Sequence, residues 1–418
     1  MMMMRTAPRG NRLHIAFFGR RNVGKSSLVN ALAGQPVSIV SETAGTTTDP
    51  VEKAMELLPI GPVLLIDTAG LDDEGALGEQ RIDRARKVID RTDLAVLVAE
   101  AGEWTDFEQR LLDELIERET AVVVAFNKSD RDEPAAPLIE RLKKTKIRHV
   151  RTVANEREGV VELRAAMIRS VPESFIDPPP LVGDLVPSGE LAVLVVPLDM
   201  EAPKGRLILP QVQTIRDLLD SDAWCMVVKE RELRDAIDRL NRPPALVITD
   251  SQAFLKVGAD TPDHVPMTSF SILMARQKGD LTELVRGATA IERLGSGSRV
   301  LVCEACTHHP IGDDIGTVKI PRWLTQYAGG KVDFEHYRGH AFPESLEDVD
   351  LVIHCGGCVH NRREMLTRIM RCREANVPIT NYGLAIAYAL GIFERALGPF
   401  PAALEAYRAS LRSETVQG

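Results

Sequence analysis

Residues 11–170 alternate short apolar runs with stretches whose apolar residues recur at helical spacing. Each apolar run ends at a polar or glycine-rich turn, as buried parallel strands do. Strands are expected at residues 13–18, 63–67, 94–98 and 121–127, and a helix at 107–118. This alternation predicts a doubly wound α/β domain.

Prolines at positions 172 and 178–180 end this region and predict an extended linker. A second α/β segment follows, with strands expected at 191–196, 224–228 and 245–248 and helices at 212–219 and 232–240. We find no catalytic motif in it and expect a small dimerisation or spacer domain.

A third α/β segment begins near Met267. Its pattern predicts strands at 299–304, 332–337, 351–354 and 378–380 and helices at 272–294 (broken near 278–280), 362–374 and 384–397. A chain of 418 residues exceeds what one hydrophobic core supports. We therefore expect three α/β domains, at residues 1–175, 181–265 and 266–418.

Charge and hydropathy narrow the possible partners. With 51 basic against 60 acidic residues, the net charge of −9 argues against nucleic acid as the main partner, because phosphate binding needs a basic surface. No apolar run approaches the roughly 20 residues that a membrane-spanning helix needs, and residues 1–12 lack the apolar core of a signal peptide. The six cysteines then indicate metal binding, catalysis or burial in a reducing cytoplasm.

The sequence from Gly19 to Ser26 fits the phosphate-binding loop GxxxxGK(S/T). It follows a predicted strand and precedes a predicted helix, the context in which the motif is meaningful. Backbone N–H groups of such a loop surround phosphates, Lys25 adds a cation, and the Ser26 hydroxyl is expected to bind Mg²⁺. The residues expected to contact the nucleotide here are Gly19, Asn22, Gly24, Lys25, Ser26 and Ser27.

Two further motifs stand at predicted strand ends. In Asp-Thr-Ala-Gly, Asp67 is expected to reach Mg²⁺ through water and Gly70 to donate its N–H to the γ-phosphate. In Asn127-Lys128-Ser129-Asp130, the Asp130 carboxylate can accept two hydrogen bonds that guanine donates and adenine does not. The motifs therefore predict a site for GTP.

The first switch is expected at residues 45–49, with Thr47 as a Mg²⁺ ligand, and residues 153–155 are a weak candidate for the last guanine-contacting loop. These elements resemble the translation-factor-like GTPases of tRNA modification and ribosome assembly. Asn22 and the Gly-Thr-Thr stretch are similar to potassium-dependent members, in which K⁺ supplies the charge stabilisation of an arginine finger. Leu71 stands where Ras-type GTPases have a water-orienting glutamine, so we expect slow intrinsic hydrolysis.

Cysteine and histidine gather in two short clusters, which contain Cys306, His308, His354, Cys355 and Cys358. Each cluster follows a predicted strand, so both are expected at strand carboxyl ends, where open α/β sheets bind ligands. A helix expected to begin near residue 361 would point its N-terminus at them and favour thiolates. Three thiols and one remaining position suit a 4Fe–4S cluster with an exchangeable iron.

A structural zinc site is the alternative, because Cys303 and Cys306 with the later pair formally read CxxC…CxxC. The intervening span is longer than usual, and Cys303 lies inside an apolar strand, so we expect a core thiol there. We favour the cluster over zinc. His308 and His354 are candidate fourth ligands, and an outer-shell role fits each equally well.

The CxH…HCxxC arrangement behind a GTPase region resembles the FeFe-hydrogenase maturation GTPases of the HydF family. The likeness extends to Lys-Ile-Pro-Arg-Trp-Leu from Lys319, Asn-Arg-Arg-Glu-Met from Asn361 and Pro-Ile-Thr-Asn-Tyr-Gly from Pro378. The GTPase elements are widespread, whereas their combination with the cysteine motif is specific.

The resemblance implies a P-loop GTPase domain, a dimerisation domain and a Rossmann-like iron–sulfur cluster domain. It implies a scaffold that holds a 4Fe–4S cluster through Cys306, Cys355 and Cys358, hosts a di-iron precursor carrying CO and cyanide, and delivers it to apo FeFe-hydrogenase. Two radical-SAM maturases would be upstream partners of a cytoplasmic homodimer, with GTP regulating partner exchange. The competing hypothesis is a tRNA- or ribosome-associated GTPase with a structural zinc domain.

Overall fold

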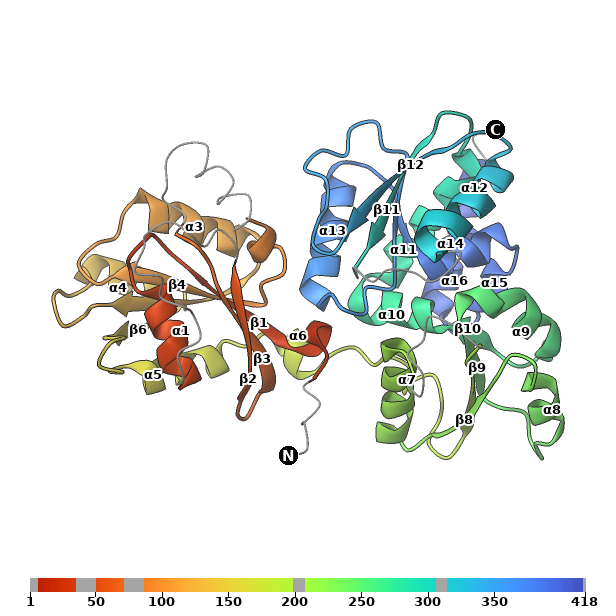
Figure 1. Ribbon diagram of the computed structural model, residues 1–418, viewed down its shortest axis with the longest axis horizontal. Helices are drawn as coiled ribbons and strands as arrows, with labels where there is room; N and C mark the ends of the chain where they lie inside the picture. Colours follow the sequence, from red (N-terminus) through yellow and green to blue (C-terminus); the bar gives the residue numbers. More distant parts are fainter. Residues whose placement is uncertain (1–6, 35–49, 71–85, 198–206, 306–313, 416–418) are drawn as a thin grey trace. The chain divides into compact units, whose positions relative to one another are not determined.

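The computed structural model describes residues 7–34, 50–70, 86–197, 207–305 and 314–415. The chain divides into two compact units, Met1–Pro178 and Pro179–Gly418 (Figure 1). The division falls at the prolines that predict a linker. No helix in the described part of the chain is long and apolar enough to cross a membrane.

The first unit is a six-stranded sheet in the order β2-β3-β1-β4-β5-β6. The β2–β3 pair is an antiparallel hairpin and the other neighbours are parallel. The strands are β1 (Leu13–Phe18), β2 (Val51–Leu57), β3 (Gly61–Asp67), β4 (Leu94–Glu100), β5 (Ala121–Asn127) and β6 (Arg148–Thr152). The helices described are α1 (Lys25–Ala33), α3 (Asp106–Glu117), α4 (Ala136–Lys144), α5 (Val160–Arg169) and α6 (Glu173–Ile176).

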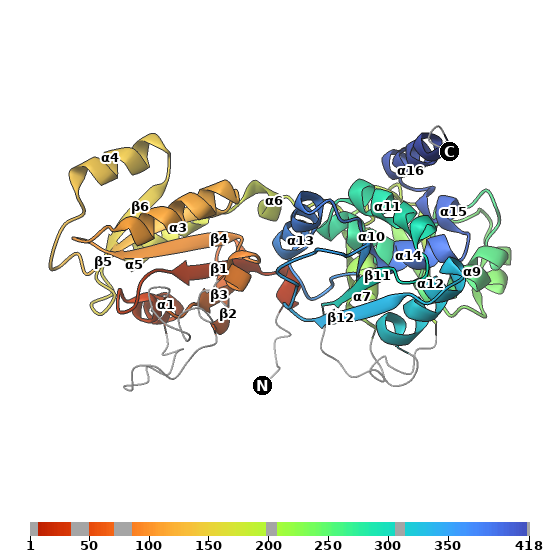
Figure 2. The same cartoon turned by 90° about the horizontal axis from the view of Figure 1, so that it is seen from above.

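Both faces of this sheet are covered, which explains why its central strands are mostly apolar. One core packs between the sheet and α1 with α5, and the other between the sheet and α3 with α4. In Figure 2, α1 and α3 lie on opposite sides of the strands. The α3 helix begins with a capping box. The Thr105 side chain accepts a hydrogen bond from a backbone N–H of the first turn, and the Glu108 side chain accepts one from the Thr105 N–H.

The second unit contains two four-stranded parallel sheets, ordered β10-β9-β7-β8 and β12-β11-β13-β14. The first has strands β7 (Leu191–Val195), β8 (Trp224–Val228), β9 (Leu246–Thr249) and β10 (Met267–Ser269), with helices α7 (Leu209–Asp220), α8 (Leu233–Asp238) and α9 (Phe254–Asp260). The second has strands β11 (Arg299–Glu304), β12 (Asp333–Arg338), β13 (Leu351–His354) and β14 (Ile379–Asn381). Its helices are α10 (Phe270–Lys278), α11 (Leu281–Thr289), α12 (Ile320–Ala328), α13 (Arg362–Glu374), α14 (Tyr382–Ala389), α15 (Phe393–Leu397) and α16 (Pro401–Thr415).

One apolar core runs through both sheets of this unit. The α10 helix contacts α7 beside the first sheet and α13 and α14 beside the second, so it joins the two layers. The helical region predicted at 272–294 is α10 and α11 followed by a 3₁₀ turn, and the predicted break lies at residues 279–280. The Asp280 side chain caps α11 there by accepting a hydrogen bond from the Glu283 N–H.

Candidate functional site

The phosphate loop connects β1 to α1 through residues with left-handed backbone angles. Gly19 and Gly24 have φ of 150° and 97°, and Asn22 has φ of 62°. A Cβ atom on Gly19 would lie 2.2 Å from the Val98 carbonyl oxygen, and one on Gly24 would lie 2.2 Å from the Asn127 Nδ2. The loop can therefore close only with glycine at these two positions.

Lys25 and Ser26 open α1 and face the end of β3. The Lys25 ammonium is buried and donates to the carbonyl oxygens of Gly19 (2.9 Å) and Arg20 (2.7 Å). Burial raises the pKa of the Asp67 carboxyl, while a hydrogen bond with Ser26 and the charge of Lys25 oppose that rise. The Asp67 Oδ1 atom is buried without a hydrogen-bond partner in the described chain. A hydroxyl beside an unpaired carboxylate oxygen is a donor set that fits Mg²⁺.

Asn127 ties three loops together at the end of β5. Its buried amide donates to the Val23 carbonyl oxygen of the phosphate loop (2.8 Å). Its Oδ1 accepts from the Ala154 N–H (3.1 Å) and the Thr152 hydroxyl (3.2 Å). The segment 153–155, the weak candidate for the last guanine-contacting loop, thus lies directly against the Asn-Lys-Ser-Asp motif.

The other predicted nucleotide residues divide between described and undescribed parts of the chain. Gly70 lies so close to the phosphate loop that a Cβ on it would be 2.8 Å from the Arg21 nitrogen. Ser27 stands in the first turn of α1. Thr47 lies outside the described residues, as does Leu71.

At the guanine motif, Lys128 has φ of 58° and pairs with Glu100 at 2.7 Å, and the Asp130 side chain is 44% exposed.

Arg20 was not singled out by sequence reasoning, yet it donates to both Glu108 and Glu103 at 2.6 Å. The Glu108 side chain is fully buried and also caps α3. Arg20 therefore anchors the phosphate loop to α3, and no sequence motif signals that contact.

Cys355, from the second cysteine motif, lies where two adjacent strands end. Cys355 follows β13, and its N–H donates to the Cys303 carbonyl oxygen of β11 (2.9 Å). The Cys355 sulfur accepts from the Ala305 N–H at 3.1 Å and from the Gly357 N–H at 3.5 Å. Backbone N–H groups aimed at sulfur stabilise a thiolate, the form that binds metal.

Cys358 lies in the turn that leads into α13. Burial raises the pKa of its thiol, while the charge of Lys278 and the N–H groups of Cys358 and Val359 lower it. Lys278 is itself buried and donates to the His360 carbonyl oxygen at 2.6 Å. Gly357 has φ of 64°, and a Cβ there would lie 2.9 Å from the Met365 sulfur. The helix begins as expected, with the Asn361 side chain capping α13.

His354, a candidate fourth ligand, has both ring nitrogens occupied. The ring is fully buried, with Nδ1 2.8 Å from the Cys355 carbonyl oxygen and Nε2 2.7 Å from an Arg368 nitrogen. Arg368 can only donate, so Nδ1 carries the proton and donates to Cys355. Burial, aided by the Arg368 charge, lowers the pKa of His354 to about 3. In this arrangement His354 orients the Cys355 backbone.

Cys306 and His308 lie outside the described residues. Cys303 is fully buried in β11, where burial raises the pKa of its thiol to about 12, and Cys372 is buried in α13. Both are core thiols, and for Cys303 this confirms the prediction. Cys225 is only partly buried. The buried positions of Lys278 and Arg368 were not predicted from the sequence, because charged residues in helices are normally solvent-exposed.

The two units of the chain match different protein families. Residues 181–279 match the hydrogen maturase F dimerization domain, and residues 282–399 match the hydrogen maturase F tetramerization domain. Residues 14–128 match the 50S ribosome-binding GTPase family. The chain belongs to the hydrogen maturase F (HydF) family. This HydF chain thus carries a P-loop GTPase domain followed by the dimerisation and tetramerisation domains of its family.

Curated relatives match the GTPase region of this HydF chain. Over 166 residues it is 36% identical to the tRNA modification GTPase MnmE of Chromobacterium violaceum, covering 40% of this chain and 36% of that protein. Over 122 residues it is 45% identical to the GTPase Der of Thermomicrobium roseum, covering 28% and 26%. The chain thus spans about a third or less of the length of these relatives. A crystal structure of an Aquifex aeolicus Era variant has 25% identity and a TM-score of 0.35, covering 49% of this chain and 65% of that one.

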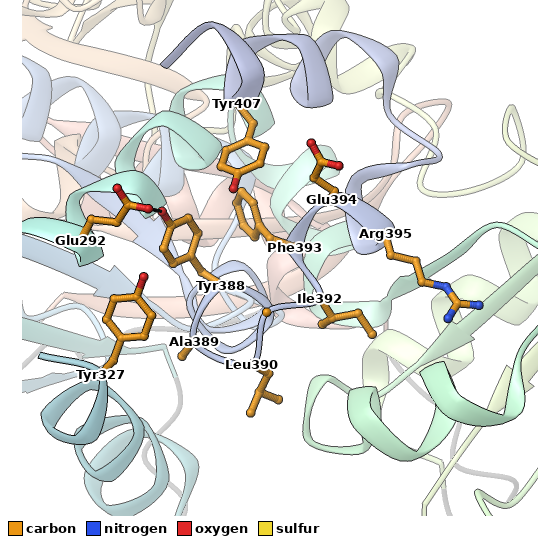
Figure 3. A pocket seen from close by; sticks show the side chains of 11 residues that line it. Glu292, Tyr327, Tyr388, Ala389, Leu390, Ile392, Phe393, Glu394, Arg395 and Tyr407 are labelled. Carbon is orange, nitrogen blue, oxygen red and sulfur yellow. Dashed lines mark hydrogen bonds between the residues drawn. The ribbon is translucent and has the colours of Figure 1, made fainter. Parts of the chain in front are cut away.

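The region of the HydF tetramerisation domain, together with Tyr407 beyond it, also forms a surface pocket of about 750 Å³ that contains none of the predicted site residues. Its aromatic side chains come from α12, α14, α15 and α16 and turn toward one another (Figure 3). Phe393 and Tyr407 pack edge to face with ring centres 4.9 Å apart, and the Tyr388 hydroxyl donates to Glu292. Tyr327 is 44% exposed at its edge.

Proposed function

We propose that this chain hydrolyses GTP and serves as a scaffold and carrier in the maturation of FeFe-hydrogenase. Its cargo is a di-iron precursor carrying CO and cyanide, which two radical-SAM maturases help to supply and which apo FeFe-hydrogenase receives. The observation that carries the proposal is the Ala305–Cys355 hydrogen bond, since it joins the two strand ends that bear the cysteine motifs in a HydF-family chain.

In this proposal Cys306, Cys355 and Cys358 hold a 4Fe–4S cluster. The donor chemistry supports it, because backbone N–H groups point at the Cys355 sulfur and buried Lys278 offsets the negative charge near Cys358. When bound, the cluster supplies an iron with one exchangeable position. His354 is a positioning residue, since both of its nitrogens are engaged, and His308 remains the candidate fourth ligand.

GTP binding is proposed to regulate partner exchange. Lys25 offsets the charge of the phosphates, Ser26 and Thr47 bind Mg²⁺, and Asp67 reaches the ion through water, with Gly70 as a γ-phosphate donor. Mg²⁺ supplies positive charge to the phosphoryl group during transfer. K⁺ beside Asn22 would add the stabilisation that an arginine finger otherwise gives.

A homodimer fits the first sheet of the second unit. Among the described strands, its edge strand β8 pairs only with β7, and Trp224 on β8 is 65% exposed. Edge strands with exposed apolar side chains are favourable pairing surfaces. We propose that dimerisation covers this edge.

The proposal is tested by anaerobic iron and sulfide analysis with an EPR spectrum after reduction. We expect about four irons and four sulfides per chain. Cys355→Ser should lose the cluster and keep GTP hydrolysis, whereas Lys25→Ala should lose hydrolysis and keep the iron. Loss of both properties in either variant would contradict two separate sites.

A tRNA- or ribosome-associated GTPase with a structural zinc domain is the second candidate, favoured by the MnmE and Der matches. Those matches cover 40% and 28% of this chain. One zinc per chain, no cluster signal after anaerobic reconstitution, and binding to RNA would support this candidate and overturn the scaffold.

A further inference from the structure

A second group of side chains that could hold a metal ion gathers at the start of α13, the helix labelled in Figure 1. His340 lies in the turn after β12, His360 in the loop after β13, and Glu364 in the first turn of α13. One ligand atom from each side chain lies within 4.8 Å of the other two. None of the three belongs to the cysteine motifs.

His360 is the least satisfied member of this group. It is 1% exposed, and neither ring nitrogen has a hydrogen-bond partner among the described residues. Its Nε2 lies 3.5 Å from a Glu364 oxygen, and its ring stacks on His340 with centres 5.3 Å apart. A buried nitrogen without a partner is costly, at about 1–3 kcal/mol. An ion that accepts the ring's lone pair would remove that cost at one of the two nitrogens.

Glu364 supplies a buried carboxylate, with a side chain 4% exposed. Its two oxygens lie 3.0 and 3.1 Å from the His340 Nδ1, and one of them also accepts from Arg368 at 2.9 Å. Arg368 limits the affinity for a second positive charge, but its guanidinium is also held by the Gly339 carbonyl oxygen and His354. The second carboxylate oxygen therefore remains directed at His340.

The group of His340, His360 and Glu364 is also accessible from solvent, because the His340 side chain is 32% exposed. A histidine–carboxylate hydrogen bond by itself would explain His340 and Glu364. It would leave both nitrogens of His360 unexplained.

We propose that His340, His360 and Glu364 bind one divalent transition-metal ion. Two imidazole nitrogens and one carboxylate oxygen are the donors of Zn²⁺ and non-haem Fe²⁺ sites. Three protein ligands leave positions open on the side of His340, so the ion could exchange or bind a further ligand. The site goes beyond the proposed scaffold function and does not depend on it.

Co²⁺ is the probe, because its visible absorption reports its ligands. The full-length chain would carry serine at positions 306, 355 and 358, so that no cysteine-held cluster interferes. After chelator treatment we expect one Co²⁺ per chain without a thiolate charge-transfer band, and displacement by Zn²⁺. His340→Ala should weaken binding by at least the roughly 10–100-fold that loss of an outer-shell partner costs.

The matched control is His264→Ala, which removes an exposed imidazole elsewhere in the chain and should leave Co²⁺ binding unchanged. Glu364→Gln should weaken binding like His340→Ala; if that buried change prevents folding, the partly exposed His340 decides alone. Equal affinity in His340→Ala and the parent, or no Co²⁺ bound by the parent, would overturn the site. Failure here would leave the iron, sulfide and EPR results of the scaffold untouched.

Discussion

Replacing Arg368 with methionine should strongly destabilise the second unit. The Arg368 side chain is 4% exposed and donates to His354, Glu364 and the Gly339 carbonyl oxygen at 2.7, 2.9 and 3.0 Å. Methionine keeps much of the volume and removes all three donors. The change leaves the Glu364 carboxylate buried without its cation.

Breaking a buried ion pair by removing one partner costs about 3–5 kcal/mol. For a domain the size of this unit, each kcal/mol lowers Tm by about 2–4 °C, so the expected loss is roughly 6–20 °C. Arg371→Met is the matched control on the same helix. Arg371 lies over the Phe342 ring and donates to the Pro343 carbonyl oxygen at 2.6 Å, so its loss should cost only about 1 kcal/mol.

Thermal and denaturant unfolding of the full chain would measure both variants. The double variant Arg368→Met with Glu364→Gln should recover part of the loss, because the buried carboxylate loses its charge. Two results would refute this reasoning. Arg368→Met could lower stability no more than Arg371→Met does, or the effects of Arg368→Met and Glu364→Gln could simply add.

Two further predictions concern packing and thiol chemistry. Gly287→Ala should lower the free energy of unfolding, measured with denaturant, by about 1–3 kcal/mol or more, because its Cβ would lie 1.9 Å from the Ile379 carbonyl oxygen. In the control Gly258→Ala, the new Cβ meets only the end of a flexible side chain, so stability should change by less than about 1 kcal/mol. Equal stability of the two variants would refute the packing argument. With a pKa of about 12, only about 10⁻⁴ of the Cys303 thiol is thiolate at pH 8. In the folded chain a thiol reagent should therefore label Cys303 far more slowly than partly buried Cys225. The rate of Cys303 labelling should rise about tenfold per pH unit. Rapid labelling of Cys303 without unfolding would contradict that burial.

The sequence predicted strands where both faces of the sheet are covered. The strands at 13–18, 121–127, 299–304 and 351–354 have the predicted bounds, because every position there except exposed Arg299 is apolar or buried. The β2 strand was missed because it is an edge strand of the described sheet and includes charged residues such as Glu52 and Lys53. Separate domains at 181–265 and 266–418 stay a prediction, since one core runs through both sheets.

The candidate sites divide in the same way. The phosphate-loop motif and the cysteine motifs are each local in the sequence, and the rule that parallel strands end at one sheet edge predicts one site in each unit. Lys278 and Arg368 could not be predicted, because their contacts with His360 and His354 join residues 82 and 14 positions apart through charged side chains. A helical pattern assigns such residues to the surface.

The Ala305–Cys355 hydrogen bond also has a consequence for the order of events during synthesis. It joins residues 50 positions apart, and β12 is made between the two strands that carry them. At about 5–20 residues per second, several seconds separate the two ends of this contact at the ribosome. During that interval the earlier strand end has no partner thiol beside it. Any metal centre built across this sheet edge is therefore loaded only after β13 has been translated and has joined the sheet.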